Sequence, residues 1–349
     1  MGHSNLLSFN MPPISKGGLL GVLSGAGGGG GSANNWYSEI TRKTLDGSAS
    51  QVQTSEFTPT ENLMFLASFE GDNTNDPFLE FNDEAGSLYS NIYSRNGSVS
   101  SDTNQGLGLR LAQGTTDPMF SYGWIENISD EIKLVQGWTV EENGTGNTAP
   151  DCQQFMGKFD KTDEQINQLA LTRASGNFED TSEIVALGTD YSGQSNDNFW
   201  EKIAEDKTSG SEQYLEVTGL TEKKYYFVQY YYQGTTDMKV RFSSGGSFDD
   251  GNNYNQRFVY NGTFDTGTGR DNIELTSGSK SFTTMFILNI DGKPKILVND
   301  SSLQNIANTQ NDKITFGKWT ETDSLDGIRV FADGHTFTDN SIMTVWGHD

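Results

Sequence analysis

Residues 157–188 read GKFDKTDEQINQLALTRASGNFEDTSEIVALG, and residues 317–347 read GKWTETDSLDGIRVFADGHTFTDNSIMTVWG. The two stretches share an opening Gly-Lys-aromatic triplet, the spacing of their apolar residues and a closing glycine, with one residue deleted from the second. Turn residues and apolar positions are not expected to agree in this way by chance. The chain therefore contains an internal duplication, and the fold has to be derived for a repeated unit.

The correspondence continues upstream, where the turn Asn96-Gly97 matches Asn261-Gly262. We predict that the two copies span residues 34–188 and 199–349, joined by a short polar linker at 189–198. Each copy is about 150 residues long, which is the size of a whole domain and far longer than a solenoid repeat.

The composition favours an all-β fold. The chain is 33% apolar and contains 40 glycines. Short apolar runs such as Leu63-Met64-Phe65-Leu66 and the aromatic run from Tyr225 to Tyr232 predict strands, and Asn-Gly dipeptides predict tight hairpins. We predict two tandem β-sandwiches of jelly-roll type, each with about eight or nine antiparallel strands. Helices are expected only in the short stretches 163–168 and 199–205.

Charge and residue usage exclude several functional classes. The formal net charge of −24 argues against nucleic-acid binding and disfavours anionic lipid. No apolar run is long enough to span a membrane, and the lone Cys152 excludes an intramolecular disulfide. With three histidines and no Ser/His/Asp pattern, a hydrolytic triad is not expected. We therefore predict that the protein is not an enzyme.

Residues 1–33 differ from the rest of the chain because they are rich in glycine and contain no acidic residue. The first interpretation is a flexible leader without a function of its own, since each glycine raises the cost of ordering. The second is a docking arm that becomes buried on assembly through its apolar side chains, of which we single out Leu19, Leu20, Val22 and Leu23.

Two oxygen-rich loops are candidates for calcium, through Asp83 and Glu84 in the first copy and Asp249 and Asp250 in the second. Polar turns have the same composition, and no EF-hand pattern is present. We therefore expect no cofactor and prefer the interpretation as turns.

Four tyrosines beside polar turn residues are candidates for a glycan-binding platform: Tyr89, Tyr93, Tyr254 and Tyr260. Sandwich cores also require large aromatic residues, and this alternative is preferred. The run Glu321, Asp323, Asp326 places carboxylates as glycosidases do. The first copy has no equivalent set, so we interpret the run as a solvated strand edge.

The duplicated unit resembles a domain found in structural proteins of marine tailed viruses, especially tail-fibre-like proteins. The resemblance rests on the blocks 81–97, 144–159 and 176–188 and covers nearly everything beyond residue 34. The second copy departs from it, because it lacks the Gly-Asn-Thr-Ala-Pro segment of residues 146–150. The resemblance implies a scaffold without catalytic residues.

We therefore expect a protein of the virion surface, either a short fibre or adhesin or a capsid decoration protein. Its expected partners are other virion proteins, bound through residues 1–33, and a glycan of the host surface. A homotrimer is expected, because one weakly bound arm needs others for avidity. The alternatives are a double-jelly-roll capsid shell protein and a secreted carbohydrate-active enzyme or glycan-binding module.

Overall fold

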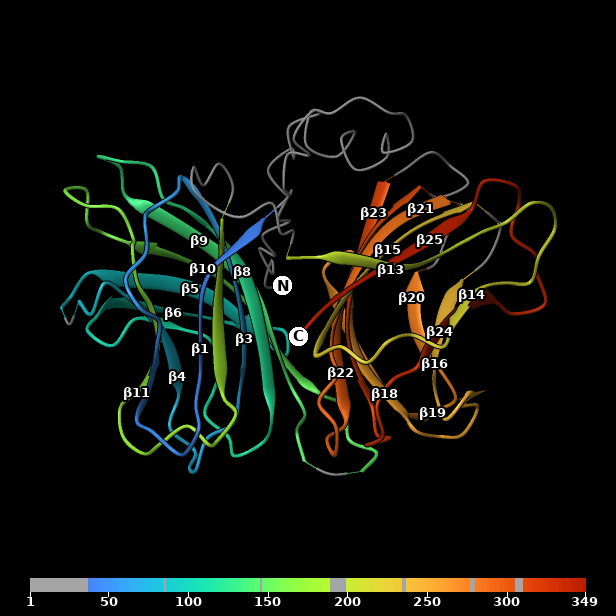
Figure 1. Ribbon diagram of the computed structural model, residues 1–349, viewed down its shortest axis with the longest axis horizontal. Coiled ribbons are helices and arrows are strands. Elements are labelled where there is room, and N and C mark those ends of the chain that lie inside the picture. The colour runs from blue at the N-terminus through green and yellow to red at the C-terminus, as the bar shows by residue number, and fades with distance from the viewer. Residues whose placement is uncertain are drawn as a thin grey trace, which may run out of the picture.

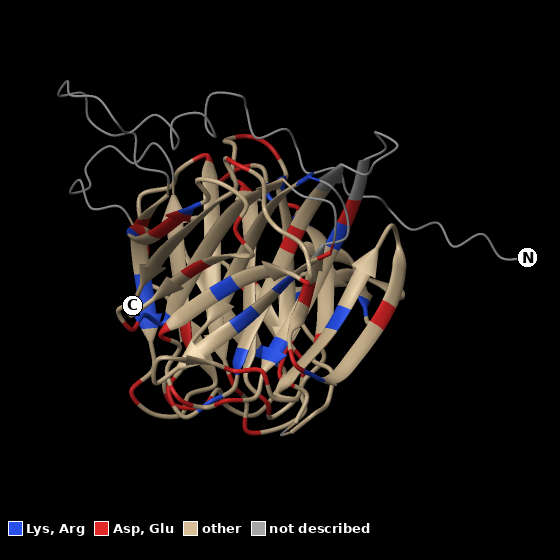
Figure 2. Cartoon of the chain, turned by 90° about the vertical axis from the view of Figure 1, so that its right-hand side faces the viewer, with Lys and Arg blue, Asp and Glu red and all other residues tan. Residues whose placement is uncertain are grey.

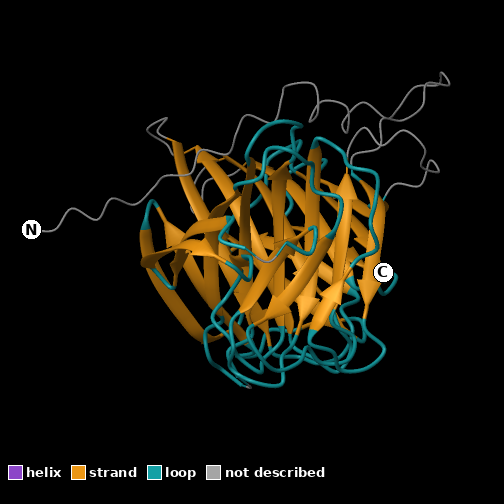
Figure 3. Cartoon of the chain, turned by 90° about the vertical axis from the view of Figure 1, so that its left-hand side faces the viewer, coloured by secondary structure: helices purple, strands orange, loops and turns teal. Residues whose placement is uncertain are grey.

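The computed structural model describes residues 37–84, 86–144, 146–188, 199–233, 237–276, 280–304 and 310–349. Within these residues the regular structure consists of β-strands and contains no α-helix (Figure 3). The strands form four antiparallel sheets that make up two β-sandwiches, which confirms the predicted fold class. The described residues form twelve strands in the first sandwich and thirteen in the second, so the predicted number of eight or nine is too low. Figure 1 shows the two sandwiches side by side, one coloured blue to green and the other yellow to red.

The first sandwich packs a large sheet of eight strands on a small sheet of four. In spatial order the large sheet consists of β1 (Ser38–Thr44), β12 (Glu183–Gly188), β3 (Asn62–Phe69), β8 (Met119–Glu126), β9 (Lys133–Glu141), β10 (Asp151–Phe159), β5 (Tyr89–Arg95) and β6 (Ser98–Gln105). The small sheet consists of β2 (Gln51–Gln53), β11 (Leu169–Arg173), β4 (Pro77–Phe81) and β7 (Leu109–Arg110).

The second sandwich repeats this strand order. Its large sheet consists of β13 (Glu201–Lys207), β25 (Ile342–His348), β15 (Tyr225–Gln233), β21 (Lys280–Leu288), β22 (Lys295–Gln304), β23 (Gln310–Trp319), β18 (Tyr254–Tyr260) and β19 (Thr263–Arg270). Its small sheet consists of β14 (Tyr214–Thr218), β24 (Gly327–Ala332), β16 (Met238–Ser244) and β17 (Ser247–Phe248), with β20 (Ile273–Thr276) also paired to β16.

The strand register shows that matched residues occupy matched places. Phe159 pairs with Tyr89 across β10 and β5, and Trp319 pairs with Tyr254 across β23 and β18. All four side chains are fully buried, and each pair of rings is stacked. The Gly-Lys-aromatic triplet therefore fixes the same core position in both halves.

The Asn-Gly dipeptides form the hairpins that the sequence predicts. Asn96-Gly97 joins β5 to β6, and Asn261-Gly262 joins β18 to β19. All four residues have positive φ, between 47° and 88°. This conformation gives a two-residue turn the twist of its strands, and asparagine and glycine adopt it at low cost.

The two predicted helices are wrong. Residues 163–168 form a loop, and Glu201–Lys207 is the edge strand β13, paired with β25. The mixed polar sequence of β13 does not show this pairing, because an edge strand exposes much of its surface. The linker at 189–198 and the arm residues Leu19, Leu20, Val22 and Leu23 lie outside the described residues.

Three apolar clusters hold the four sheets together. One fills each sandwich, and the third lies between the two large sheets. Strand β15 contributes to two of them, because Tyr226 and Val228 point into the second sandwich while Tyr225 and Phe227 point into the third cluster. This explains why the strand is aromatic on both faces.

Candidate functional site: the joint between the sandwiches

We use the term joint for the contact between the outer faces of the two large sheets. Its apolar part is the third cluster, to which the first sandwich contributes Met64, Leu66, Phe120, Tyr122, Trp138, Val140, Cys152, Val185 and Leu187. The second sandwich contributes Phe199, Trp200, Tyr225, Phe227, Phe286, Leu288, Ile296, Val298 and Phe316. Strand β22 crosses β8 and β9 at this contact.

Aromatic rings fill the centre of the joint. The ring of Phe286 lies 4.4 Å from that of Tyr122, 4.7 Å from that of Phe227 and 6.0 Å from that of Trp200, measured between centroids. Phe286 is 4% exposed. Ligand pockets occur often at domain interfaces, but here side chains occupy the space.

Four contacts between a carboxylate and a basic side chain cross the joint in the described residues. The first sandwich supplies the carboxylate in every case, and the second supplies Lys or Arg in three of them and His348 in the fourth. The pairs are Glu183 with Lys224 at 3.2 Å, Asp151 with Arg257 at 3.2 Å, Glu70 with Lys293 at 2.9 Å and Glu39 with His348 at 3.4 Å. This complementarity fixes the register of the two sheets.

Lys318 is buried at one end of the joint and binds backbone of the other sandwich. Its Nζ donates to the carbonyl oxygens of Glu142 at 3.0 Å and Gly144 at 2.9 Å, and to Oγ1 of Thr148 at 3.2 Å. Burial lowers the pKa of Lys318, and the negative charge of Glu142 opposes this shift. The three oxygens compensate the buried ammonium group for its lost water.

Glu183 is the acidic centre of a second cluster, and it is 2% exposed. It receives a hydrogen bond from Tyr225 Oη at 2.8 Å and forms ion pairs with Lys224 and, at 3.5 Å, with Arg42. A further hydrogen bond comes from Thr44 Oγ1. Burial alone would raise the pKa of Glu183, but Lys224 and these other groups hold it below the ordinary value.

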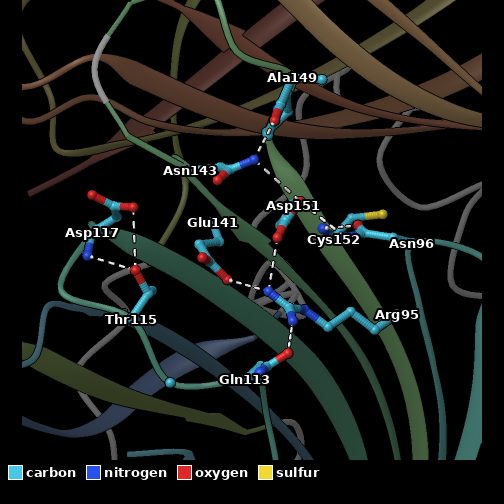
Figure 4. A network of polar contacts seen from close by, with 12 residues as sticks. Arg95, Asn96, Gln113, Thr115, Asp117, Glu141, Asn143, Ala149, Asp151 and Cys152 are labelled. Atoms are coloured by element: carbon cyan, nitrogen blue, oxygen red, sulfur yellow. Dashed lines mark hydrogen bonds and ion pairs between the residues drawn. The ribbon is translucent and has the colours of Figure 1, made fainter. Parts of the chain in front are cut away.

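Asp151 joins arginines from the two sandwiches, as part of the network in Figure 4. Its carboxylate accepts from Arg95 at 2.7 Å and, across the joint, from Arg257 at 3.2 Å. Asn96 also donates to it, at 2.9 Å. Glu141 lies directly opposite Asp151 in the strand register, 3.4 Å from the same Arg95 nitrogen.

Glu141 should make stability depend on pH. Burial raises its pKa to about 7, Arg95 opposes the shift and Asp151 adds to it. A carboxyl group whose pKa rises on folding stabilises the folded state below its unfolded pKa, and this contribution is lost as the pH rises through 7. We expect the free energy of unfolding to fall by about 2–3 kcal/mol between pH 4.5 and about pH 8 because of this residue.

Urea unfolding at a series of pH values measures this effect. The Glu141→Gln variant should lose that part of the pH dependence, because glutamine does not titrate. The control is Glu61→Gln at an exposed position, which should leave the profile unchanged. An unchanged profile in Glu141→Gln would contradict the assignment.

The structure separates the four tyrosines proposed for glycan binding. Tyr89 and Tyr254 are fully buried and bond to the backbone of Phe81 and Phe242, so they are core residues and their assignment to a platform is wrong. Tyr93 lies on the inner side of the large sheet, packed against the core, with the guanidinium of Arg110 5.8 Å from its ring. Tyr260 is half-buried on β18 in the other sandwich.

The calcium candidates make contacts within the protein. Asp249 accepts from the indole nitrogen of Trp319 at 2.7 Å and orients that ring, and Glu84 forms an ion pair with Lys161. Asp83 and Asp250 lie at the surface of their turns. Across the described part of the chain, no three His, Cys, Asp or Glu residues are grouped as they would need to be to hold a metal ion.

The acidic run after Trp319 is also engaged in structural contacts. Glu321 accepts from Asn253 at 3.0 Å, and Asp326 accepts from Ser243 and from the backbone nitrogen of Gly246. A shallow cleft of 470 Å³ lies beside the joint, with charges of both signs in its lining, including Lys223, which is paired with Asp349.

The joint was not found from the sequence, although one signal pointed to it. The acceptors of Lys318 lie within the segment 146–150 that the second copy lacks, in the case of Thr148, or just before it, in the case of Glu142 and Gly144. A segment present in one copy only, paired with an aromatic-rich face in the other, marks an asymmetric contact between them.

Charges are mixed over the surface of the second sandwich. In Figure 2, Lys and Arg stand singly among acidic residues, without an extended basic area on the coloured part of the chain. None of the described residues forms a helix of the length and apolarity that a bilayer span requires.

Comparison with known proteins gave matches among solved structures alone. No family model matches the sequence, and no curated protein matches it. Similar chains among solved structures include an exo-inulinase from Aspergillus awamori, at 8% identity and a TM-score of 0.29, covering 90% of this chain and 96% of that one. A likeness at this TM-score carries no argument about fold or function.

Proposed function

We propose that the protein is a non-enzymatic structural protein of a virus particle surface, either a short fibre or adhesin or a capsid decoration protein. Residues 1–33 would attach it to the particle, and the two sandwiches would project outward as one unit. The resemblance of the duplicated domain to tail-fibre-like proteins is the basis for placing it on a virion.

The joint is the observation that carries the structural role. A scaffold that transmits force between attachment point and outer surface needs domains held in a fixed relation. Here an aromatic core, three lysine or arginine ion pairs of one polarity and the buried Lys318 hold the sandwiches together. A two-domain enzyme more often leaves a cleft at this place for its substrate.

The buried acidic residues at the joint and beside it also support this proposal. Glu141, Asp151 and Glu183 all contact arginine or lysine within the network or the joint. The contacts of Asp151 and Glu183 hold one large sheet against the other, and that of Glu141 lies within its own sheet. A glycan of the host surface remains a proposed partner, for which Tyr93 and Tyr260 are the remaining aromatic candidates.

Attachment by the arm can be tested with particles that lack the protein. We expect full-length protein to cosediment with them and a variant without residues 1–33 to be lost in washing. Each docked leucine or valine contributes about 1.5–3 kcal/mol, and ordering each glycine opposes this by about 1–2 kcal/mol. Single arms therefore bind weakly, and several copies acting together would add avidity, as in the expected homotrimer.

Circular dichroism should show that the truncated variant keeps its sandwiches, which controls for misfolding. Equal retention of both forms would place the anchor in a sandwich. If mass spectrometry of purified particles does not detect the protein, the virion role itself is wrong.

A further inference from the structure

Four of the eight exposed large apolar side chains of the described residues lie on one face of the first sandwich. We use the term free sheet end for Ile92, Val99, Leu134 and Met156, which are 36%, 56%, 53% and 37% exposed. Ile92 pairs with Met156, and Val99 pairs with Ser94 two residues beyond Ile92, so the strand register directs them to the outer face of the large sheet. Ile128 and Ile132, each 38% exposed, lie in the turn that leads into Leu134.

The second sandwich uses this same part of its sheet to form the joint. Leu134 is opposite Lys158, as Ile296 is opposite Lys318. Met156 is opposite Ile92, as Phe316 is opposite Arg257. Ile296 and Phe316 are 1% and 0% exposed because the first sandwich covers them. The free sheet end is therefore the uncovered counterpart of a protein-binding surface within the same chain.

The two matched lysines show the difference directly. Lys318 is buried and donates to three oxygens across the joint. Lys158 has the same local sequence, Gly-Lys-aromatic, but its side chain is 41% exposed and pairs with Asp160 at 2.8 Å. Among the described residues, none covers this surface of the first sandwich as the joint covers its counterpart.

The joint is asymmetric, because the first sandwich contributes the opposite end of its sheet. Tyr122 and Trp138 face each other there, and the equivalent cross-strand pair in the second sandwich is Thr284 and Asp300. That end of the second sheet is polar. A head-to-tail array of copies would press the free sheet end against Asp300, which is unfavourable for an apolar surface.

We propose that the free sheet ends of two copies of this chain pack on each other about a two-fold axis. The surface is continuous with the joint through Trp124. The ring of Trp124 packs edge-on against that of Trp138 in the joint, at 5.5 Å between centroids. On the other side, Trp124 and Met156 both pair with Gln136, so they lie side by side on the same face of the sheet. An interface with three-fold symmetry needs two different complementary surfaces. The other exposed large apolar residues among those described are Leu107 and Tyr214, which stand apart from each other, so a dimer is favoured over the expected trimer.

The net charge of the chain determines how the affinity of the dimer changes with salt. Each copy carries a formal net charge of −24, so long-range repulsion opposes the dimer and salt screens it. An apolar contact between acidic copies should therefore tighten as ionic strength rises.

Sedimentation equilibrium of the full chain tests the proposal. We expect a dimer at micromolar concentration, and a dissociation constant about 100-fold weaker for Leu134→Lys and for Met156→Lys. The matched control is Tyr214→Lys, which places the same charge at another exposed apolar position, 45% exposed on the second sandwich, and should leave the dimer unchanged. Unfolding curves for each variant separate lost association from lost folding.

Two further measurements distinguish this arrangement from others. Met156 lies on β10, between Ile92 on β5 and Leu134 on β9, so a two-fold axis through the middle of the surface passes beside it. Met156→Cys should therefore form an intermolecular disulfide under oxidation, and the buried Cys152 does not compete. Removing residues 1–33 should leave the dimer intact. A monomeric wild type, a dimer that survives both lysine variants, or loss of the dimer on removing the arm would each overturn the proposal, and none of these bears on attachment to a particle.

Discussion

Replacing Phe286 by alanine should lower the free energy of unfolding by about 3–5 kcal/mol, which is typical of a buried phenylalanine. Phe286 lies at the centre of the joint, against Tyr122, Phe227 and Trp200. The cavity would open between two sheets that are held by their shared contact. We expect the wild type to unfold in a single transition, because the joint couples the two sandwiches. The Phe286→Ala variant should instead unfold in two transitions, one for each sandwich.

Urea unfolding followed by tryptophan fluorescence and by circular dichroism measures both effects. The matched control is Trp124→Ala, because Trp124 occupies in the first sandwich the position that Phe286 occupies in the second. The large sheet of the second sandwich covers Trp124 only in part, so its side chain is half-buried. Its loss should cost less and leave one transition. Equal costs for the two variants would show that the joint adds nothing to the stability of either sandwich.

Replacing Glu183 by alanine should cost about 3 kcal/mol, near the lower end of the range for removing one partner of a buried ion pair. The change leaves Lys224 and Arg42 with no acid between them, and the hydroxyl groups of Tyr225 and Thr44 with no acceptor. Glu183→Gln keeps an acceptor for these hydroxyl groups and should cost less. The difference between the two variants separates charge from hydrogen bonding.

The pH dependence has the opposite sign from that of Glu141. Because its partners hold the pKa of Glu183 below the ordinary value of 4.5, its stabilisation is present above pH 4.5 and is lost as the pH falls further. The control is Glu205→Ala, which breaks an exposed pair with Lys202 and should cost less than about 1 kcal/mol. A similar small cost at Glu183 would mean that the buried cluster contributes no net stability.

The sequence by itself determined the elements and their duplication. Alternation of apolar residues and the Asn-Gly turns at 96–97 and 261–262 are local properties, since strand period and turn conformation depend on neighbouring residues. The match of Phe159 with Trp319 placed one core position correctly in both halves. The edge strand β13 was missed because partial exposure removes the alternating pattern.

Only the tertiary structure decided which surfaces are covered. Lys158 and Lys318 have the same local sequence, yet one is exposed and the other fully buried. Tyr89 and Tyr254 have polar neighbours along the chain and are core residues nonetheless. Burial depends on which sheet faces meet, and the two faces come from residues far apart in the sequence, as Tyr122 and Phe286 do. The two copies of one fold therefore differ in this surface. In the second sandwich the first sandwich covers it, and in the first sandwich it is exposed among the described residues.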